Sequence, residues 1–172
     1  MIERVIHKQD LSVIRSFVTD ALPTARWIEN GFGRRYAKYS EAPNFNEVFA
    51  LYGMKPIRVE PMFQCFIGNH YLDGACVHEH QDSNDGDLVH TRVNVMLKKP
   101  KHGGNPVLNG VEVNVEEGDI WLCIAGEERH SSTPVLGGER LIFSYGGLVK
   151  RNEIEALEDG TVFVNIFVEG KQ

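Results

Sequence analysis

The sequence is poor in the features that would set it apart from ordinary globular proteins. It has only three cysteines, Cys65, Cys76 and Cys123, an odd number at irregular spacing in apolar surroundings. This pattern favours buried free thiols over a disulfide framework. No apolar run approaches the roughly 20 residues of a membrane span, and the first residues lack the apolar stretch of a signal peptide. We therefore expect a cytoplasmic protein with no membrane partner.

Basic residues are also in the minority. The 172 residues contain 18 lysines and arginines against 24 acidic residues, for a formal net charge of -6. Because binding to phosphate backbones requires clustered positive charge, we expect no nucleic-acid partner. The hydrophobic share of 42% is ordinary, and the length suffices for one domain with a buried core. We predict a single domain over residues 1–172; no particular oligomeric state follows from the sequence.

Residues 1–55 are predicted to form a helical and loop support. Between Asp10 and Leu22 the apolar residues recur at three- and four-residue steps, which predicts an amphipathic helix capped by Asp10 and stopped by the following proline. A second, shorter helix is predicted over residues 44–52. Between the two, the glycine-rich segment that contains Arg34–Tyr39 is interpreted as an exposed loop, with a substrate-binding lid as the alternative.

The hydrophobic period changes to two at residue 56. From there on, short runs of β-branched and aromatic residues, among them residues 74–80, alternate with Gly, Pro, Asn or Asp. Asn109-Gly110, between two apolar runs, is a strong hairpin signal. The last run, residues 161–170, is interpreted as an outer strand or a dimer contact. Helices first and eight or more strands after predict a mainly β, α+β chain whose core, residues 56–172, is a β-sandwich or jelly roll.

Two histidines and one carboxylate stand in this strand region with the spacing of a metal site. Residues two apart on a strand point to the same side, so His80 and Asp82 can reach one metal from the end of a single strand. His130, at the edge of a later run, supplies the third ligand. Two imidazoles and one carboxylate form the facial triad of non-haem Fe(II) oxygenases, which leaves metal positions open for a cosubstrate and dioxygen.

Arg140 follows His130 near the start of the next predicted strand. Its guanidinium is a permanent cation that can bind a carboxylate through two parallel hydrogen bonds. Ser144 lies on the same face as Arg140 if the strand is regular, because their separation is even. These residues suit a ligand that chelates the metal and carries a carboxylate tail.

The ordered set resembles the Fe(II)- and 2-oxoglutarate-dependent oxygenase superfamily, particularly its prolyl-4-hydroxylase-like branch. The resemblance covers about residues 71–147 and rests on Tyr71, Gly74, His80-Gln81-Asp82, Arg92, Gly103-Gly104, Gly118-Asp119-Ile120-Trp121, His130, Pro134-Val135, Gly138 and Arg140. It implies a double-stranded β-helix fold, with iron held by His80, Asp82 and His130 and the distal carboxylate of 2-oxoglutarate held by Arg140. Tyr71 and Asn94 are further candidates for hydrogen bonds to the cosubstrate.

The resemblance also implies a reaction. Related halogenases replace the carboxylate ligand with a small residue, whereas Asp82 is present here, which favours hydroxylation or another oxidation. The implied cofactors are Fe(II), 2-oxoglutarate and O2, and 2-oxoglutarate is converted to succinate while a substrate C–H bond is oxidised. The expected substrate is a small molecule or an amino-acid or peptide side chain. One departure is Ile142, where many members of the family carry a hydroxyl residue.

A cupin is the alternative interpretation of the same region. His78 and His80, with one residue between them, resemble a cupin metal pair, and cupins share the jelly-roll shape. The glutamate that usually follows such a pair is missing, and Arg140 has no cupin role. In the oxygenase interpretation His78 is a neighbour of the metal or the substrate. A binding protein with a structural metal is the remaining alternative, which the open positions of the triad count against.

Overall fold

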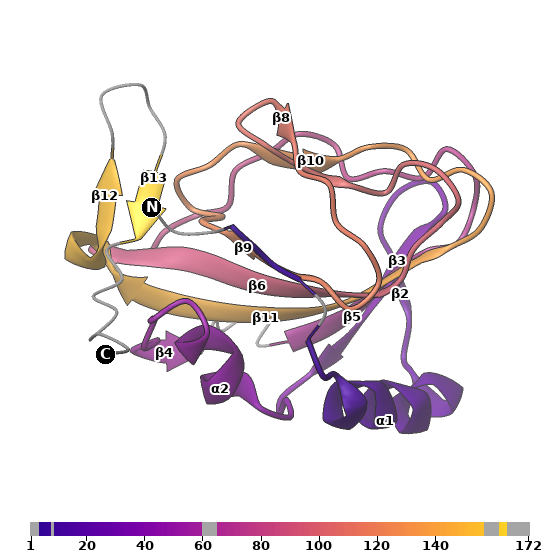
Figure 1. Cartoon of the computed structure of the whole chain (residues 1–172), viewed down its shortest axis with the longest axis horizontal. Coiled ribbons are helices and arrows are strands. Elements are labelled where there is room, and N and C mark those ends of the chain that lie inside the picture. The colour runs from indigo at the N-terminus through magenta and orange to yellow at the C-terminus, as the bar shows by residue number, and fades with distance from the viewer. Residues whose placement is uncertain (1–3, 8, 60–64, 157–161, 165–172) are drawn as a thin grey trace.

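The computed structural model describes residues 4–7, 9–59, 65–156 and 162–164 (Figure 1). Its main sheet contains eight strands: β1 (Val5–Ile6), β2 (Ile28–Glu29), β3 (Arg34–Tyr39), β4 (Arg58–Val59), β5 (Cys65–His70), β6 (Leu88–Lys98), β9 (Ile120–Cys123) and β11 (Arg140–Lys150). Their spatial order is β1-β9-β6-β11-β5-β3-β2, and β4 pairs with β11. All pairings in this sheet are antiparallel.

A second sheet of three strands faces the main one, and Figure 1 shows it in the upper part of the molecule. It contains β7 (Pro106–Leu108), β8 (Val111–Glu112) and β10 (His130–Ser132) in the order β10-β7-β8. Asn109 and Gly110 connect β7 to β8 with φ angles of 48° and 78°, the backbone that a two-residue hairpin turn requires. Two facing antiparallel sheets form the jelly roll, so the predicted fold class is confirmed.

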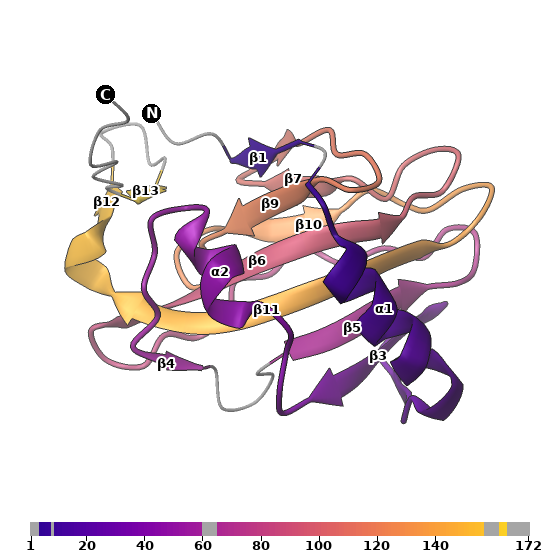
Figure 2. The ribbon, with the colours of Figure 1, turned by 60° about the horizontal axis from the view of Figure 1, so that its bottom comes forward.

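Both α-helices lie on one face of the main sheet (Figure 2). They are α1 (Ser12–Ala21), which continues into the 3-10 helix η1 (Leu22–Thr24), and α2 (Phe45–Ala50). Leu11, not the predicted Asp10, occupies the N-cap position of α1, and its side chain makes no cap hydrogen bond. Asp10 lies one residue earlier, and its carboxylate accepts a hydrogen bond of 3.0 Å from the Ser12 backbone N–H. The apolar stripe of α1, with Ile14 and Val18, is buried in the core. This packing stabilises α1 against the sheet.

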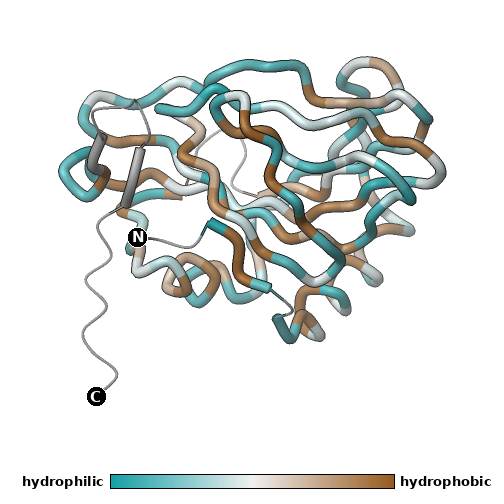
Figure 3. Tube along the Cα trace, turned by 45° about the horizontal axis from the view of Figure 1, so that its top comes forward, coloured by the Kyte–Doolittle hydropathy of each residue, from teal (hydrophilic) through white to brown (hydrophobic). Residues whose placement is uncertain are grey.

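Alternation along the strands gives the two faces of the main sheet different chemistry. Val93 of β6 and Tyr145 of β11 are fully buried in the hydrophobic core that includes the helices. Arg92 and Asn94 of β6 and Arg140 of β11, at even positions, point to the opposite side and are also buried. Figure 3 shows hydrophobic and hydrophilic residues exchanging at short intervals along the chain. Buried polar side chains enclosed between two sheets mark the second face as the place for a binding site.

Two local predictions are wrong. The segment Arg34–Tyr39, predicted as a loop or lid, is the strand β3, which pairs with β5 and with β2. The run of residues 74–80, predicted as a strand, is irregular, and only His80 forms an isolated bridge. Pairing with neighbours decides both cases. β5 and β2 offer β3 a partner on each edge, whereas residues 74–77 exchange only scattered backbone hydrogen bonds with residues 132–135 and form no regular ladder. The single-domain organisation stays a prediction.

The remaining elements lie near the C-terminus. The 3-10 helix η2 (Arg151–Glu153) precedes the hairpin of β12 (Ile154–Ala156) and β13 (Val162–Val164). The rest of the predicted run 161–170 lies outside the described residues. All three cysteines are free thiols, two of them buried and Cys76 half-buried. No helix in the described part of the chain combines the length and hydropathy of a membrane span.

Candidate metal centre and its cavity

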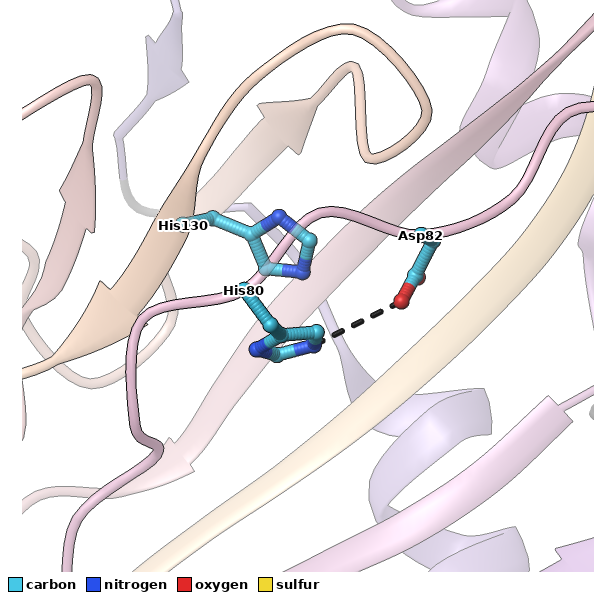
Figure 4. Close-up of side chains that lie close together, drawn as sticks. All are labelled: His80, Asp82 and His130. Carbon is cyan, nitrogen blue, oxygen red and sulfur yellow. Dashed lines mark ion pairs between the residues drawn. The ribbon is translucent and has the colours of Figure 1, made fainter.

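His80, Asp82 and His130 come together at one point between the two sheets (Figure 4). Each offers one ligand atom, and these atoms all lie within 4.8 Å of one another. His80 Nε2 lies 3.4 Å from Asp82 Oδ1, and the two imidazole rings have centroids 4.2 Å apart. Among the described residues this is the one group of three histidine, cysteine or acidic side chains that could hold a metal ion. It contains the three residues that the sequence predicts.

Backbone hydrogen bonds join the two histidines directly. The His80 N–H donates to the His130 carbonyl at 3.0 Å, and the His130 N–H donates to the His80 carbonyl at 2.8 Å. The Asp82 N–H donates to the carbonyl of Ala125 at 2.8 Å. The segment that carries His80 and Asp82 is therefore fastened at both residues, although it is not the strand end that we predicted.

Both imidazoles are oriented by backbone carbonyls. His80 Nδ1 lies 2.8 Å from the carbonyl oxygen of His78, and His130 Nδ1 lies 3.0 Å from that of Glu128. Because a carbonyl oxygen only accepts, each neutral ring carries its proton on Nδ1 and presents the Nε2 lone pair. Metal-binding histidines are held in this way in proteins. The donor set thus fits a divalent ion such as Fe(II).

The Asp82 carboxylate lies between two histidines. His90 Nδ1, on β6, lies 3.2 Å from Asp82 Oδ2, on the other side from His80. Burial by itself raises the pKa of Asp82, but the hydrogen bonds to His80 and His90 and the neighbouring positive charges outweigh it and hold that pKa well below its usual range. Asp82 is therefore ionised at neutral pH, the form that binds a metal. The sequence analysis did not identify His90. His90 lies two residues before Arg92, so alternation along a strand places both side chains on the same face, and this was the signal that could have found it.

A cavity of about 200 Å³ extends from the metal group between the two sheets. Arg140 lines it and is only 4% exposed. Burial, followed by the charge of Arg34, lowers the pKa of Arg140 to about 10, so the guanidinium remains charged at neutral pH. Its Nε has no hydrogen-bond partner among the described residues. The guanidinium lies 5.7 Å from the centroid of the Trp121 ring, and no carboxylate pairs with it among the described residues. A buried cation without an anionic partner is costly, which marks this end of the cavity as a place for an anion.

The other residues predicted to contact the cosubstrate differ in whether they line the cavity. Asn94 lines the cavity, whereas Ser144, its cross-strand neighbour, is fully buried and accepts a hydrogen bond of 3.0 Å from Arg92 Nη1. Tyr71 is not among the described residues that line the cavity, and its hydroxyl donates to a Glu29 carboxylate oxygen at 2.9 Å.

The His78 side chain is exposed and does not belong to the metal group found among the described residues. Its contribution to the centre is the backbone carbonyl that orients His80. Of the residues that could touch a cosubstrate, the cavity therefore brings Asn94 and Arg140 to the metal group and leaves Tyr71 and Ser144 outside its lining.

No protein-family model matches this sequence, and a search of curated proteins gives no significant match. Solved structures do match. HygX from Streptomyces hygroscopicus, crystallised with nickel, 2-oxoglutarate and hygromycin B, has a TM-score of 0.60 and 13% identity over 85% of this chain and 82% of its own. An oxidoreductase of the 2OG-Fe(II) oxygenase family from Burkholderia pseudomallei has a TM-score of 0.56 and 15% identity over 79% of this chain and 80% of its own.

A third similar structure is the collagen prolyl hydroxylase of Paramecium Bursaria Chlorella virus-1 in complex with 2OG. It has a TM-score of 0.57 and 14% identity, and the match covers 86% of this chain and 96% of the viral one. At such identities the likeness establishes the fold. The chain therefore has the jelly-roll fold that 2-oxoglutarate oxygenases and prolyl hydroxylases share.

Proposed function

We propose that this protein is an Fe(II)- and 2-oxoglutarate-dependent dioxygenase that hydroxylates a C–H bond of a small molecule or an exposed amino-acid side chain. One observation carries this conclusion: His80, Asp82 and His130 share a cavity with Arg140, a buried cation that lacks an anionic partner among the described residues. The fold shared with HygX, which was crystallised with 2-oxoglutarate and nickel, supports it.

The residues take distinct roles. His80 and His130 would hold the metal through Nε2, and Asp82 through its carboxylate. When bound, iron supplies the activation of dioxygen, with 2-oxoglutarate as the co-reductant that leaves as succinate and CO2. Arg140 would bind the distal carboxylate of 2-oxoglutarate through charge-assisted hydrogen bonds, which are stronger in a buried site than in water.

The residues that line the cavity would orient the cosubstrate and exclude bulk water. Asn94 would offer its amide as a hydrogen-bond donor to the cosubstrate, and the Arg92–Ser144 hydrogen bond fixes the side chain next to it. Trp121 and Ile142 line the cavity with apolar surface and are nearly fully buried. Apolar walls keep bulk water from the reacting groups. This favours coupling between the oxidative decarboxylation of 2-oxoglutarate and the oxidation of the substrate.

The cupin alternative finds no support at the site. It requires His78 as a ligand, but His78 does not belong to the metal group found among the described residues, and its backbone carbonyl orients His80 instead. It also leaves the buried charge of Arg140 without a role.

An anaerobic titration with Fe(II) and then 2-oxoglutarate tests the proposed function. The wild type should develop the weak visible charge-transfer band of the chelate, and His130→Ala should not. Arg140→Gln should need about 10- to 100-fold more 2-oxoglutarate, since a charge-assisted pair is lost. Lys150→Gln removes an exposed cation from the far end of the same strand and should behave as the wild type. A wild type that binds metal but develops no band contradicts the proposed function.

A further inference from the structure

A second arginine lines the same cavity in a row with Arg140. His70 of β5 pairs with Arg140 of β11 on one side and with Arg34 of β3 on the other. Directly opposed residues of antiparallel strands project to the same face of a sheet. The three side chains therefore stand side by side, and all three line the cavity.

The charges of Arg34 and Arg140 act on each other and on His70 between them. The charge of Arg34 contributes, after burial, to the lowered pKa of Arg140. Burial, followed by the charges of Arg140 and Arg34, lowers the pKa of His70 to about 2. A neutral His70 therefore stands between the two cations.

The Arg34 guanidinium has N–H donors available for a ligand. Its Nη1 donates to the carbonyl of Cys76 at 2.9 Å, which fixes the direction of the half-buried side chain. A guanidinium has five N–H donors, so this contact leaves an edge available for a ligand. Among the described residues Arg34 has no carboxylate partner, and Asp82 is the one carboxylate that lines the cavity. Two cations of one row therefore face a cavity that has little negative charge of its own.

The cosubstrate accounts for only one of these two cations. 2-Oxoglutarate has two carboxylates, one that chelates the metal and one that pairs with Arg140, so no anionic group remains for Arg34. We propose that Arg34 recognises a carboxylate or phosphate of the substrate, and that the enzyme acts on small anionic molecules. This assignment rests on the proposed function and narrows it, because an uncharged side chain within a polypeptide offers no such group.

Binding to a turnover-inactive protein tests the assignment without knowledge of the substrate. The Zn(II)-loaded protein, saturated with 2-oxoglutarate, is titrated by calorimetry with methyl phosphate, with acetate and with neutral acetamide. We expect saturable binding of at least one anion and none of acetamide. Arg34→Gln should weaken anion binding about tenfold or more, because a charge-assisted hydrogen bond is lost. Lys38→Gln, which removes an exposed cation from the same strand, should bind as the wild type.

The outcomes separate the possibilities. Binding of methyl phosphate alone assigns a phosphate substrate, and binding of acetate alone or of both assigns a carboxylate as sufficient. If neither anion binds the wild type, or if Arg34→Gln binds them as the wild type does, the assignment is overturned. Equal affinity of wild type and variant also identifies an anion bound to the zinc alone.

One further variant and one comparison of affinities guard against other causes. Arg34→Lys keeps the charge and loses the two-pronged geometry, so it should weaken anion binding less than Arg34→Gln; a larger loss overturns the assignment. Arg34→Gln should change the affinity for 2-oxoglutarate far less than Arg140→Gln does. If 2-oxoglutarate fails to bind at all, the proposed function fails, and anion titrations of the Zn(II) protein alone, compared between Arg34→Gln and Arg140→Gln, still decide the role of Arg34.

Discussion

His90 approaches the Asp82 carboxylate from the side that His80 leaves open. His90 Nδ1 lies 3.2 Å from Asp82 Oδ2, while His80 Nε2 lies 3.4 Å from Asp82 Oδ1. Only 5% of His90 is exposed, so its position is set by the strand β6. Asp82, the carboxylate of the candidate metal centre, lies on an irregular segment and is thus oriented by a residue on a central strand.

Replacement of His90 by alanine should therefore weaken metal binding. Partners that orient metal ligands contribute roughly 10- to 100-fold in affinity, and we expect a loss in this range for His90→Ala. The dissociation constant for Mn(II) or Zn(II), measured by competition with a chelating dye, checks it. His102→Ala removes an exposed histidine and should have no effect. Equal affinities for all three proteins would contradict a positioning role.

The lack of a side chain at Gly126 leaves space for the polar contacts of Asn84, which hold the segment that carries His80 and Asp82. A Cβ at this position would lie 1.7 Å from Asn84 Oδ1. Asn84 donates to the Gly126 carbonyl at 3.0 Å and accepts from the His90 N–H at 3.0 Å. Gly126→Ala must push Asn84 aside, so we expect a loss of about 1–3 kcal/mol in unfolding free energy and a weaker metal site.

Urea denaturation and the same metal titration measure the two effects of Gly126→Ala. Gly31→Ala is the matched control, since nothing lies within 4 Å of the added Cβ and its cost comes from the φ of +90° in the turn before β3. It should lower stability and leave the metal affinity unchanged. A Gly126→Ala protein with wild-type metal affinity would show that the segment adapts without loss.

Metal binding should weaken as the pH falls. The hydrogen bond to Asp82 raises the pKa of His80 above its ordinary value of 6.5, so this ring is protonated over more of the neutral range. A metal requires the free Nε2 lone pair and must displace the proton. Affinity is therefore full above the raised pKa of His80 and is lost as the pH drops through it. Burial lowers the pKa of His130, which stays neutral in that range.

Calorimetric titrations with Zn(II) in two buffers of different ionisation enthalpy measure this proton release. We expect about one proton released per metal bound at the acid end of the range and fewer at the alkaline end. A metal affinity and a proton count that do not vary with pH would show that His80 is already neutral.

His70 should make the fold sensitive to acid. Burial and the nearby arginines lower its pKa from 6.5 to about 2 in the folded state. Below pH 6.5 the His70 side chain therefore binds a proton in the unfolded chain but not in the folded chain. The free energy of unfolding falls as the pH drops below 6.5. The slope is at most about 1.4 kcal/mol per pH unit for one group.

The variant His70→Asn removes this titration. Between pH 7 and pH 5 the wild type should lose about 2 kcal/mol more unfolding free energy than the variant. Urea denaturation at both values gives the difference of slopes, which is independent of the constant cost of the substitution itself. Identical slopes for the two proteins would mean that His70 gains its proton without unfolding.

Much of the site follows from the sequence alone. The residue types and order of His80, Asp82, His130 and Arg140 predict a metal site with an anion anchor, and the structure brings all four to one cavity. Period-two patterning after residue 56 predicted the strands of the core, because alternation of side chains is a local property of an extended chain. The hairpin at Asn109 likewise depends only on neighbouring residues.

The tertiary structure decided what depends on strand pairing. The pairing of β3 with β5 turned the predicted loop of Arg34 into a wall of the cavity, and the register of β3, β5 and β11 set Arg34, His70 and Arg140 in one row. The contact of His90 with Asp82 joins β6 to an irregular segment. A sequence determines which side of a strand each residue takes, but the packing of the whole core selects which strands meet and in which register.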